Sequence, residues 1–371
     1  MLPVVGAAGR GAAHFDVDSR FLADDALLTP SGKVATYWAL RDCGVGPGDR
    51  VAVPAYHCPT MVYPVIALKA EPVFIAVGER LEISPAAVAE AIRRGARALI
   101  LPHFFGFVQP HIDEILRVCR AGKMSLVEDC AHAMYARRGS RLPGSWGDYA
   151  ITSTRKYIPG SEGGALVANR HPIVHPRAGA SVKEEIRGVW HLLNDAIRFG
   201  SVPGLAWLGG RGDAPLIGPA SDAESQREAS LTPASAAETD SSASERLALR
   251  SVQWLVRHSD HNRIAQVRRR RFEQWADAVS GSEHVEAFAT SLTAEQVPYV
   301  FPVRLKRPSA QFKALKYKGI SVWRWDHLAL SDCQVSARLA VDLVQMPCQH
   351  SMGDAAFERL VREFSRAVAS A

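Results

Sequence analysis

The stretch EPVFIAVGERLEISPAAVAEAIRRGARALILPHFF (residues 71–105) holds two apolar runs with a helical pattern between them. EPVFIAV (71–77) and ARALILPHFF (96–105) are typical of β-strands. Ser84 and Pro85 fit an N-cap followed by proline at the first helical position. A strand, a helix and a second strand in succession predict two parallel strands joined by a crossover helix.

The same alternation extends to both sides of this stretch. RVAVPAY (50–56) and MSLVEDC (124–130) are further predicted strands. The helical patterns fall at 32–44, 84–95 and 111–123, and Gly44, Gly95 and Gly122 close them. The sequence therefore predicts an α/β fold with a mostly parallel sheet between layers of helices.

A change of pattern after about His171 predicts a second, smaller α/β domain. A chain of 371 residues suggests about two domains. Residues 209–244 are rich in Gly, Ala, Ser, Pro and Asp and are predicted to form a flexible linker or insertion. We therefore expect a large domain at 1–208 and a small domain at 245–371. The elements expected outside the first half are helices at 182–199, 245–279, 309–319 and 354–369 and strands at 297–305 and 320–325.

The composition of the chain excludes few classes of function. The net charge of +6 favours anionic ligands such as phosphates, and it is weak support for nucleic-acid binding. The densest basic run, Arg268 to Arg271, lies in a helical pattern and is interpreted as a solvated face. The six cysteines are scattered without CxxC spacing, which favours a reduced, cytoplasmic compartment. We expect no signal peptide and no membrane span.

The first chemistry-bearing motif is VEDCAHA (127–133), at the end of a predicted buried strand. A buried aspartate is costly unless it meets a cation, and a protonated pyridine nitrogen is such a cation. Asp129 fits that role, with His132 on the adjoining turn. The structural alternative is that Asp129 caps the next segment and His132 is a hydrogen-bonded core histidine.

The second motif is ITSTRKYIPGSEGGALV (151–167), where a lysine stands between a polar run and a glycine pair. Lysine forms Schiff bases with carbonyl groups, so Lys156 is a candidate reactive amine. Ser153 is a candidate phosphate donor, and Gly163-Gly164 would let backbone pass close to a cofactor. Taken alone, Lys156 fits an ordinary surface lysine better.

The third motif is SGKVA (31–35), which opens the first predicted helix. Backbone N–H groups at a helix N-terminus bind phosphate, Gly32 permits close approach and Lys33 adds charge. Alone, Ser-Gly before a helix is an ordinary N-cap. In parallel sheets, ligands bind at the carboxyl ends of strands, so we expect the motifs to share one crevice.

Together these stretches resemble the DegT/StrS-type aminotransferases, a family of fold type I enzymes that use pyridoxal 5'-phosphate (PLP). The resemblance extends over nearly the whole chain apart from the linker. It is carried by PSGKVATYWAL (30–40), GVGPGDRVAVPAYHC (44–58), LPHFFGF (101–107), VEDCAHA, GSRLPGSWGDYAITSTRK (139–156), SEGGALV (161–167) and LVQMPCQHSMGDAAFERLVREF (343–364).

The resemblance implies a role for each motif. Lys156 becomes the Schiff-base lysine, Asp129 the partner of the pyridine nitrogen and His132 the neighbour of the phenolic oxygen. The implied phosphate contacts are Gly32, Lys33 and Ser153. The family further implies a homodimer that transfers an amino group, from glutamate, to a nucleotide-linked keto sugar for surface polysaccharide or secondary-metabolite sugar biosynthesis.

One departure concerns the aromatic residue that stacks on the cofactor. The family often has a Ser/Thr-aromatic pair after the second strand, whereas this chain has His57 and Cys58 there. We expect His57, or Tyr56 beside it, to take the aromatic position.

Other readings of the sequence remain open. VWRWD (322–326) in the small domain offers arginine and tryptophan to a diphosphate and a sugar, although packing explains them as well. His103 and Tyr135 lie near the predicted crevice, and they also fit a purely structural role. The alternative functions are a PLP-dependent lyase or dehydratase on the same scaffold and a non-catalytic PLP-binding relative.

Overall fold

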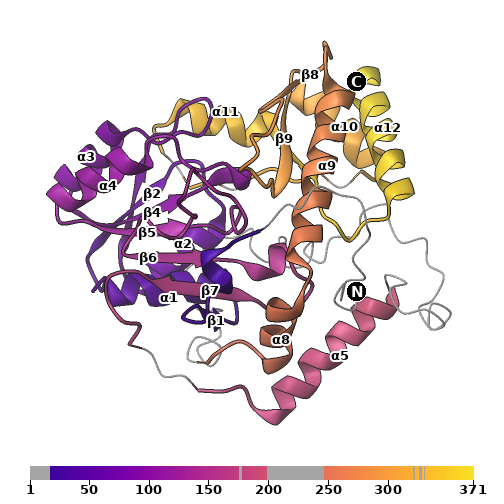
Figure 1. The fold of residues 1–371 in the computed structure, drawn as a ribbon. Helices are drawn as coiled ribbons and strands as arrows, with labels where there is room; N and C mark the ends of the chain where they lie inside the picture. Colours follow the sequence, from indigo (N-terminus) through magenta and orange to yellow (C-terminus); the bar gives the residue numbers. More distant parts are fainter. Residues whose placement is uncertain (1–16, 175–177, 199–245, 321, 326–327, 330) are drawn as a thin grey trace.

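The computed structural model describes residues 17–174, 178–198, 246–320, 322–325, 328–329 and 331–371. Figure 1 shows a large sheet built from the first half of the chain and a small sheet built from its C-terminal part. The predicted linker 209–244 lies outside the described residues. Within the described ranges, no helix is both long enough and apolar enough to cross a bilayer.

The large sheet has seven strands in the order β1-β7-β6-β5-β4-β2-β3. The strands are β1 (Leu27–Thr29), β2 (Arg50–Pro54), β3 (Glu71–Ile75), β4 (Ala96–Pro102), β5 (Ser125–Asp129), β6 (Tyr149–Thr152) and β7 (Gly164–Ala168). Neighbours from β6 to β3 pair in parallel, whereas β7 is antiparallel to both β6 and β1. The predicted mostly parallel sheet is confirmed, and every strand of it except β7 ends at the same edge.

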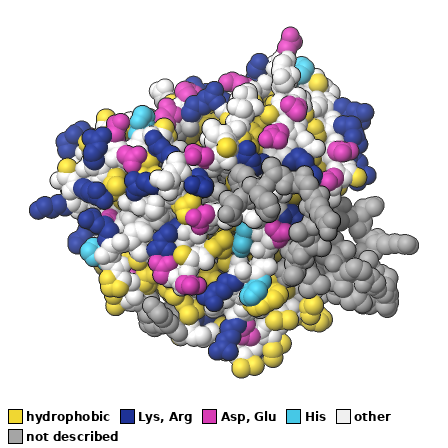
Figure 2. All heavy atoms as spheres, viewed as in Figure 1, with side chains coloured by type: hydrophobic (Ala, Val, Ile, Leu, Met, Phe, Trp, Pro, Cys, Tyr) yellow, Lys and Arg dark blue, Asp and Glu magenta, His cyan; other side chains and the backbone are white. Residues whose placement is uncertain are grey.

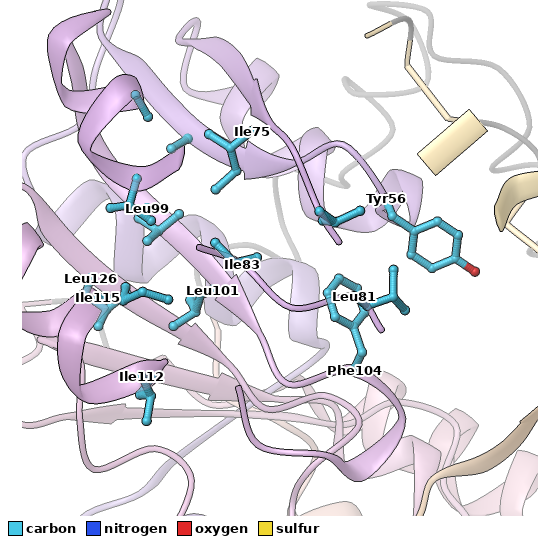
Figure 3. Packing of buried hydrophobic residues seen from close by; sticks show 14 of the residues in the cluster. Tyr56, Ile75, Leu81, Ile83, Leu99, Leu101, Phe104, Ile112, Ile115 and Leu126 are labelled. Carbon is cyan, nitrogen blue, oxygen red and sulfur yellow. The ribbon is translucent and has the colours of Figure 1, made fainter. Parts of the chain in front are cut away.

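Helices cover both faces of this sheet and make it the middle of three layers. The helices are α1 (Gly32–Asp42), α2 (Pro59–Ala67), α3 (Pro85–Arg93) and α4 (Ile112–Ala121). Side chains alternate between the faces of a strand. Leu99 and Leu101 of β4 pack with Ile115 of α4 (Figure 3), whereas Ala98 and Ile100 pack with side chains of α1 and α2.

The predicted helices 32–44, 84–95 and 111–123 enclose α1, α3 and α4. Helix α2 and strand β1 were not expected from the sequence. In α2, Pro59 stands at the first turn and Pro64 lies inside the helix, which hides the helical pattern. Short 3-10 turns at Arg20–Leu22, Phe104–Gly106 and Thr154–Lys156 complete this part of the chain.

The C-terminal part forms the smaller α/β unit around an antiparallel sheet of order β10-β9-β8. Its elements are α9 (His261–Val279), β8 (Val285–Ala287), β9 (Val300–Leu305), α10 (Pro308–Tyr317), α11 (Gln334–Asp342), β10 (Leu343–Pro347) and α12 (Asp354–Ser370). Phe272, Trp275, Phe301, Phe357 and Phe364 are central to its core. Helices α5 (Val182–Arg198) and α8 (Arg250–His258) lie near the large sheet, at the bottom of Figure 1.

Two expectations about this part are wrong. The single helix expected at 245–279 is interrupted, because Ser259 is extended and Asp260 starts α9 by accepting a hydrogen bond from the Arg263 N–H at 2.9 Å. The strand expected at 320–325 is absent from the described residues, where Trp323 forms only an isolated bridge with Gln345.

The interpretation of Arg268 to Arg271 as a solvated face is also wrong for two of its members. Arg268 and Arg271 are each 1% exposed, and they lie three residues apart on the same side of α9. Their guanidinium groups donate hydrogen bonds to backbone carbonyl oxygens, which offsets the cost of burying them.

Gly164 is required where β7 passes the start of α1, and this predicts the effect of an alanine there. A Cβ at Gly164 would overlap the backbone carbonyl of Ser31, whereas a Cβ at Gly46 would meet nothing within 4 Å. We expect Gly164→Ala to lower the free energy of unfolding by about 1–3 kcal/mol. Gly46→Ala should stay within about 0.5 kcal/mol of the wild type. Urea unfolding midpoints measure both, and equal midpoints would contradict the packing described here.

Candidate active site

The three motifs meet at the edge where the parallel strands end. Gly163 donates its N–H to the Pro30 carbonyl at 2.7 Å, and Ser31 bridges to Gly163. A Cβ added to Gly32 would lie 3.4 Å from Cβ of Ser153. The start of α1, the end of β6 and the glycine pair of β7 are therefore in direct contact. Gly164 makes room for the chain's own backbone at Ser31, and a Cβ at Gly163 would meet the Thr154 hydroxyl, roles that the sequence did not predict.

Asp129 is the last residue of β5 and is 6% exposed. Its Oδ1 accepts a hydrogen bond from the Ala131 N–H at 2.9 Å. Within the described chain, no Lys, Arg or His nitrogen lies within ion-pair distance of this carboxylate. Burial raises the pKa of Asp129, and the positive charge of Lys156 opposes that rise. The site thus contains a buried carboxylate that still lacks a close cationic partner.

His132 lies on the turn after β5 and is held in one neutral form. Its Nδ1 accepts a hydrogen bond from the Phe105 N–H at 3.3 Å, which places the ring proton on Nε2. Burial and the charges of Lys156 and Arg268 hold the pKa of His132 well below its usual value. The ring stacks on Tyr299 with centroids 4.4 Å apart. His132 is therefore a neutral imidazole with a donor at Nε2.

Lys156 ends the 3-10 turn that directly follows β6. Its backbone N–H bonds to the Ser153 carbonyl at 3.1 Å, and its carbonyl accepts a hydrogen bond from Arg268 Nη2 at 2.7 Å. Its Nζ lies 5.3 Å from the centroid of the Tyr299 ring. The same Tyr299 ring stacks on His132, and Asp129 ends the strand that pairs with β6, so the three expected catalytic residues lie in one region, where the Lys156 charge affects the pKa of both Asp129 and His132.

The residues expected to contact the phosphate do not all point toward the same place. Ser31 is the N-cap of α1, because its hydroxyl accepts a hydrogen bond from the Val34 N–H at 3.3 Å. Lys33 extends over the Tyr63 ring of α2, with Nζ 5.8 Å from the centroid. The Ser153 hydroxyl makes no hydrogen bond to a residue in the described part of the chain. Gly32 and Ser153 are therefore adjacent, whereas the Lys33 side chain is directed toward α2.

His57 lies in the interior of the large-sheet part of the chain. Its ring is 0% exposed and stacks on Phe74 at 5.0 Å. Nδ1 lies 3.0 Å from the Pro54 carbonyl oxygen, and Nε2 accepts a hydrogen bond from the Ala329 N–H at 3.2 Å. Both ring nitrogens are thus engaged in hydrogen bonds, and the ring packs in the interior; the aromatic position beside the cofactor stays a prediction for His57.

Tyr56, the other expected aromatic, contacts the rings around His132 through Trp325. Its ring packs with Phe104 at 5.9 Å and with Trp325 at 5.0 Å, and Figure 3 shows it beside Phe104 at one end of the core. The aromatic rings that surround His132 belong to Phe105, Tyr299 and Trp325.

His103 and Tyr135 have structural partners. His103 Nε2 donates to Glu128 at 3.1 Å, and Tyr135 Oη bonds to His261 Nδ1 at 2.8 Å. His103, Glu128 and Cys130 are close enough to suggest a metal site. The Glu128 carboxylate, however, already accepts backbone N–H groups of the 144–147 turn. Burial also holds the pKa of the Cys130 thiol well above its usual value. This trio is therefore a hydrogen-bonded part of the core.

Sequence reasoning missed the contribution of the second half of the chain to this site. Tyr299, Trp325 and Arg268 all lie within reach of the Lys156 and His132 cluster. Trp325 was singled out as part of VWRWD, and its ring lies 5.6 Å from that of His132. Its neighbour Arg324 packs over Phe312 at 3.9 Å. The places of Tyr299 and Arg268 in the sequence do not indicate that they lie at this site, because packing between distant segments brings them there.

The raised pKa of Asp129 predicts a pH-dependent stability. A carboxyl group whose pKa is higher in the folded state costs stability once the pH rises above its unfolded value, near 4. Without cofactor, Asp129→Asn should therefore melt at a higher temperature than the wild type at pH 7, and the difference should shrink toward pH 4. Exposed Asp277→Asn should melt like the wild type. A pH-independent difference at Asp129 would contradict the burial effect.

Comparison with known proteins relates the first half of the chain to one enzyme family. Residues 20–175 match the DegT/DnrJ/EryC1/StrS aminotransferase family. An L-glutamine:scyllo-inosose aminotransferase of Streptomyces griseus is 34% identical over 167 residues, which cover 43% of this chain and 39% of that protein. The GDP-perosamine synthase of Vibrio cholerae is 29% identical over 175 residues, covering 46% and 47%. The chain thus matches less than half the length of each of these relatives.

Solved structures match over a larger share of the chain. The aminotransferase TlmJ of Streptoalloteichus hindustanus has a TM-score of 0.62 at 19% identity, covering 93% of this chain and 86% of that one. A 3-amino-5-hydroxybenzoic acid synthase has a TM-score of 0.63 at 18% identity, covering 94% and 88%. The resemblance is therefore confirmed: this chain has the fold type I architecture of PLP aminotransferases, and its residues 20–175 match the DegT/DnrJ/EryC1/StrS aminotransferase family.

Proposed function

We propose that this protein is a PLP-dependent aminotransferase that moves an amino group from an amino acid to a keto sugar. The observation that carries the proposal is the grouping of Lys156, Asp129 and His132 at the carboxyl edge of the large sheet. The amine, the buried carboxylate without an ion-pair partner and the neutral imidazole are the groups that the chemistry requires. A relative in fold, from Streptococcus pneumoniae, was solved in its PLP form.

The residues at this edge fit the parts of the cofactor. Asp129 has a carboxylate oxygen without a hydrogen bond to the described chain, and it would face the protonated pyridine nitrogen. That contact would relieve the cost of burying the charge. His132 would donate from Nε2 to the phenolic oxygen. The Ser153 hydroxyl and the first N–H groups of α1 at Gly32 and Lys33 would hold the phosphate.

Lys156 has two parts in the proposed reaction. Its Nζ would hold the cofactor covalently until the amino donor takes that place. The released amine would then move the proton between the α-carbon of the donor and the cofactor carbon on the other side of the shared nitrogen, as general base and acid. Pyridoxal phosphate, when bound, supplies a ring that stabilises the negative charge left on that carbon, and Asp129 keeps the ring nitrogen protonated.

The finer parts of the proposal concern the substrates. We propose glutamate as the amino donor and a nucleotide-linked keto sugar as the acceptor, for surface polysaccharide or secondary-metabolite sugars. The relatives support a sugar acceptor, because their names include scyllo-inosose and GDP-perosamine. The same names include L-glutamine, so the donor assay must compare the two amino acids. We also propose that the protein acts in the cytoplasm.

Lys156→Ala is expected to abolish the visible absorbance of the purified protein. The wild type should show a Schiff-base band that borohydride removes, because Nζ is the expected point of attachment. Lys183→Ala, on the exposed side of α5, should keep the band and serves as the matched control. With a nucleotide-linked keto sugar and glutamate or glutamine, the wild type should form an amino sugar, and Lys156→Ala should lose at least about 1,000-fold in rate.

Two outcomes would overturn this assignment. Turnover that survives in Lys156→Ala would exclude the lysine as the reactive amine. Elimination of water from the sugar without consumption of an amino donor would identify a dehydratase on the same scaffold. A wild-type protein that binds no PLP would instead be a non-catalytic relative.

We also propose that the protein is a homodimer, and an exposed apolar stripe on α5 supports this. Val182, Ile186, Val189, Trp190 and Leu193 follow one another at helical spacing and are 44% to 76% exposed. Figure 2 shows hydrophobic side chains gathered along the lower edge of the molecule, over α5 and α8. A second copy of the chain would remove this surface from water.

Charges placed on this stripe should separate the dimer. We expect the double variant Ile186→Glu, Trp190→Glu to elute as a monomer in light-scattering chromatography, while the wild type elutes at twice the mass. Arg187→Glu, on the neighbouring charged side of α5, should leave the dimer intact. A monomeric wild type would contradict the proposal directly.

A further inference from the structure

We propose that Arg268 is a positioning residue that clamps the Lys156 segment of the large sheet to Tyr299 of the smaller unit. Arg268 Nη2 donates to the Lys156 carbonyl at 2.7 Å, and Nη1 donates to the Tyr299 carbonyl at 2.7 Å. The planar fork of one guanidinium therefore joins the backbones of two distant segments. The inference rests on the proposed role of Lys156 as the reactive amine.

The guanidinium is also held between aromatic rings. It lies 4.6 Å from the centroid of the Tyr157 ring and 5.6 Å from that of Tyr299, within the range of cation–π attraction. Arg268 is 1% exposed, and no carboxylate in the described residues forms an ion pair with it. These contacts hold the Arg268 side chain in one orientation. The two carbonyl oxygens and the two rings are the partners of its buried charge.

Tyr299 connects the clamp to the rest of the site. Its N–H donates to the Phe105 carbonyl at 2.8 Å, and its ring stacks on His132 at 4.4 Å. The same ring lies 5.3 Å from Lys156 Nζ. Arg268 thus holds the main chain of Lys156 and of Tyr299, whose ring lies between the Lys156 amine and a stacking contact with His132. Loss of the clamp would let the amine and the aromatic ring move apart without removing either group.

The charge of Arg268 has a second effect on the site. Together with Lys156, it contributes to the low pKa of His132. A neutral His132 keeps Nδ1 as an acceptor for the Phe105 N–H. A lysine at position 268 would keep the charge, but its single ammonium could not span both carbonyls. The Arg268→Lys variant therefore separates the geometric part of the role from the electrostatic part.

Arg271 offers a matched control on the same helix. It is also 1% exposed, and it also donates to two backbone carbonyls, those of Gln349 and Met352. Its guanidinium lies over Phe357 at 4.9 Å. None of these groups belongs to the Lys156 segment. Arg271→Met therefore measures the general cost of losing a buried arginine from α9.

The first test is hydrogen exchange of the full-length protein without cofactor. In Arg268→Met and Arg268→Lys, the amides of residues 154–158 and of Tyr299 should exchange at least about 5-fold faster than in the wild type. In Arg271→Met these amides should be unchanged, while those near residues 349–354 exchange faster. This readout does not depend on the reaction, so it stands even if the proposed function fails.

The second test uses the protein loaded with PLP. Arg268→Lys should lower kcat by about 10- to 100-fold with the donor KM within about 3-fold, because misplacing the amine slows proton transfer more than binding. Arg271→Met should retain kcat. If either methionine variant does not fold, Arg268→Lys and Arg271→Lys are compared in its place. Unchanged exchange at 154–158 in both Arg268 variants would overturn the inference, as would equal losses of kcat at positions 268 and 271.

Discussion

Asp129 ends a buried strand with its carboxylate 6% exposed and no cation within ion-pair distance in the described chain. Burying an ionised carboxylate costs free energy unless a positive group or several hydrogen bonds compensate it. Here the direct compensation is one backbone N–H, and the nearby Lys156 acts through its charge. A protonated ring nitrogen would supply a positive charge beside the Asp129 carboxylate. The proposed cofactor would therefore offset the cost of burying the Asp129 carboxylate.

The position of that carboxylate follows from the parallel sheet. Because strands from β6 to β3 run in one direction, Asp129, the turn that carries Lys156 and the start of α1 reach the same edge from segments far apart in the chain. The antiparallel strand β7 enters at this edge, where Gly163 and Gly164 pass the backbone of Ser31. The second half of the chain then closes the site with Tyr299, Trp325 and Arg268.

Much of the fold could be predicted from local patterns, and the exceptions have physical causes. The strand–helix alternation between 50 and 130 is regular, and it correctly predicted β2 to β5. Helix α2 was hidden by Pro64, and the break at Ser259 depends on a single capping aspartate. Arg268 was misjudged because a buried arginine needs carbonyl partners that only the tertiary fold supplies. The partner of His57, Ala329, could not be predicted for the same reason, since it lies far along the chain.

The most direct test of the central claim is to locate the bound cofactor by mass. The protein loaded with PLP is reduced with borohydride, digested and analysed by mass spectrometry. The account predicts a reduced phosphopyridoxyl group on the peptide that contains Lys156, in an amount of about one per chain. A modification confined to Lys33 or to surface lysines, or spread evenly among them, would contradict it.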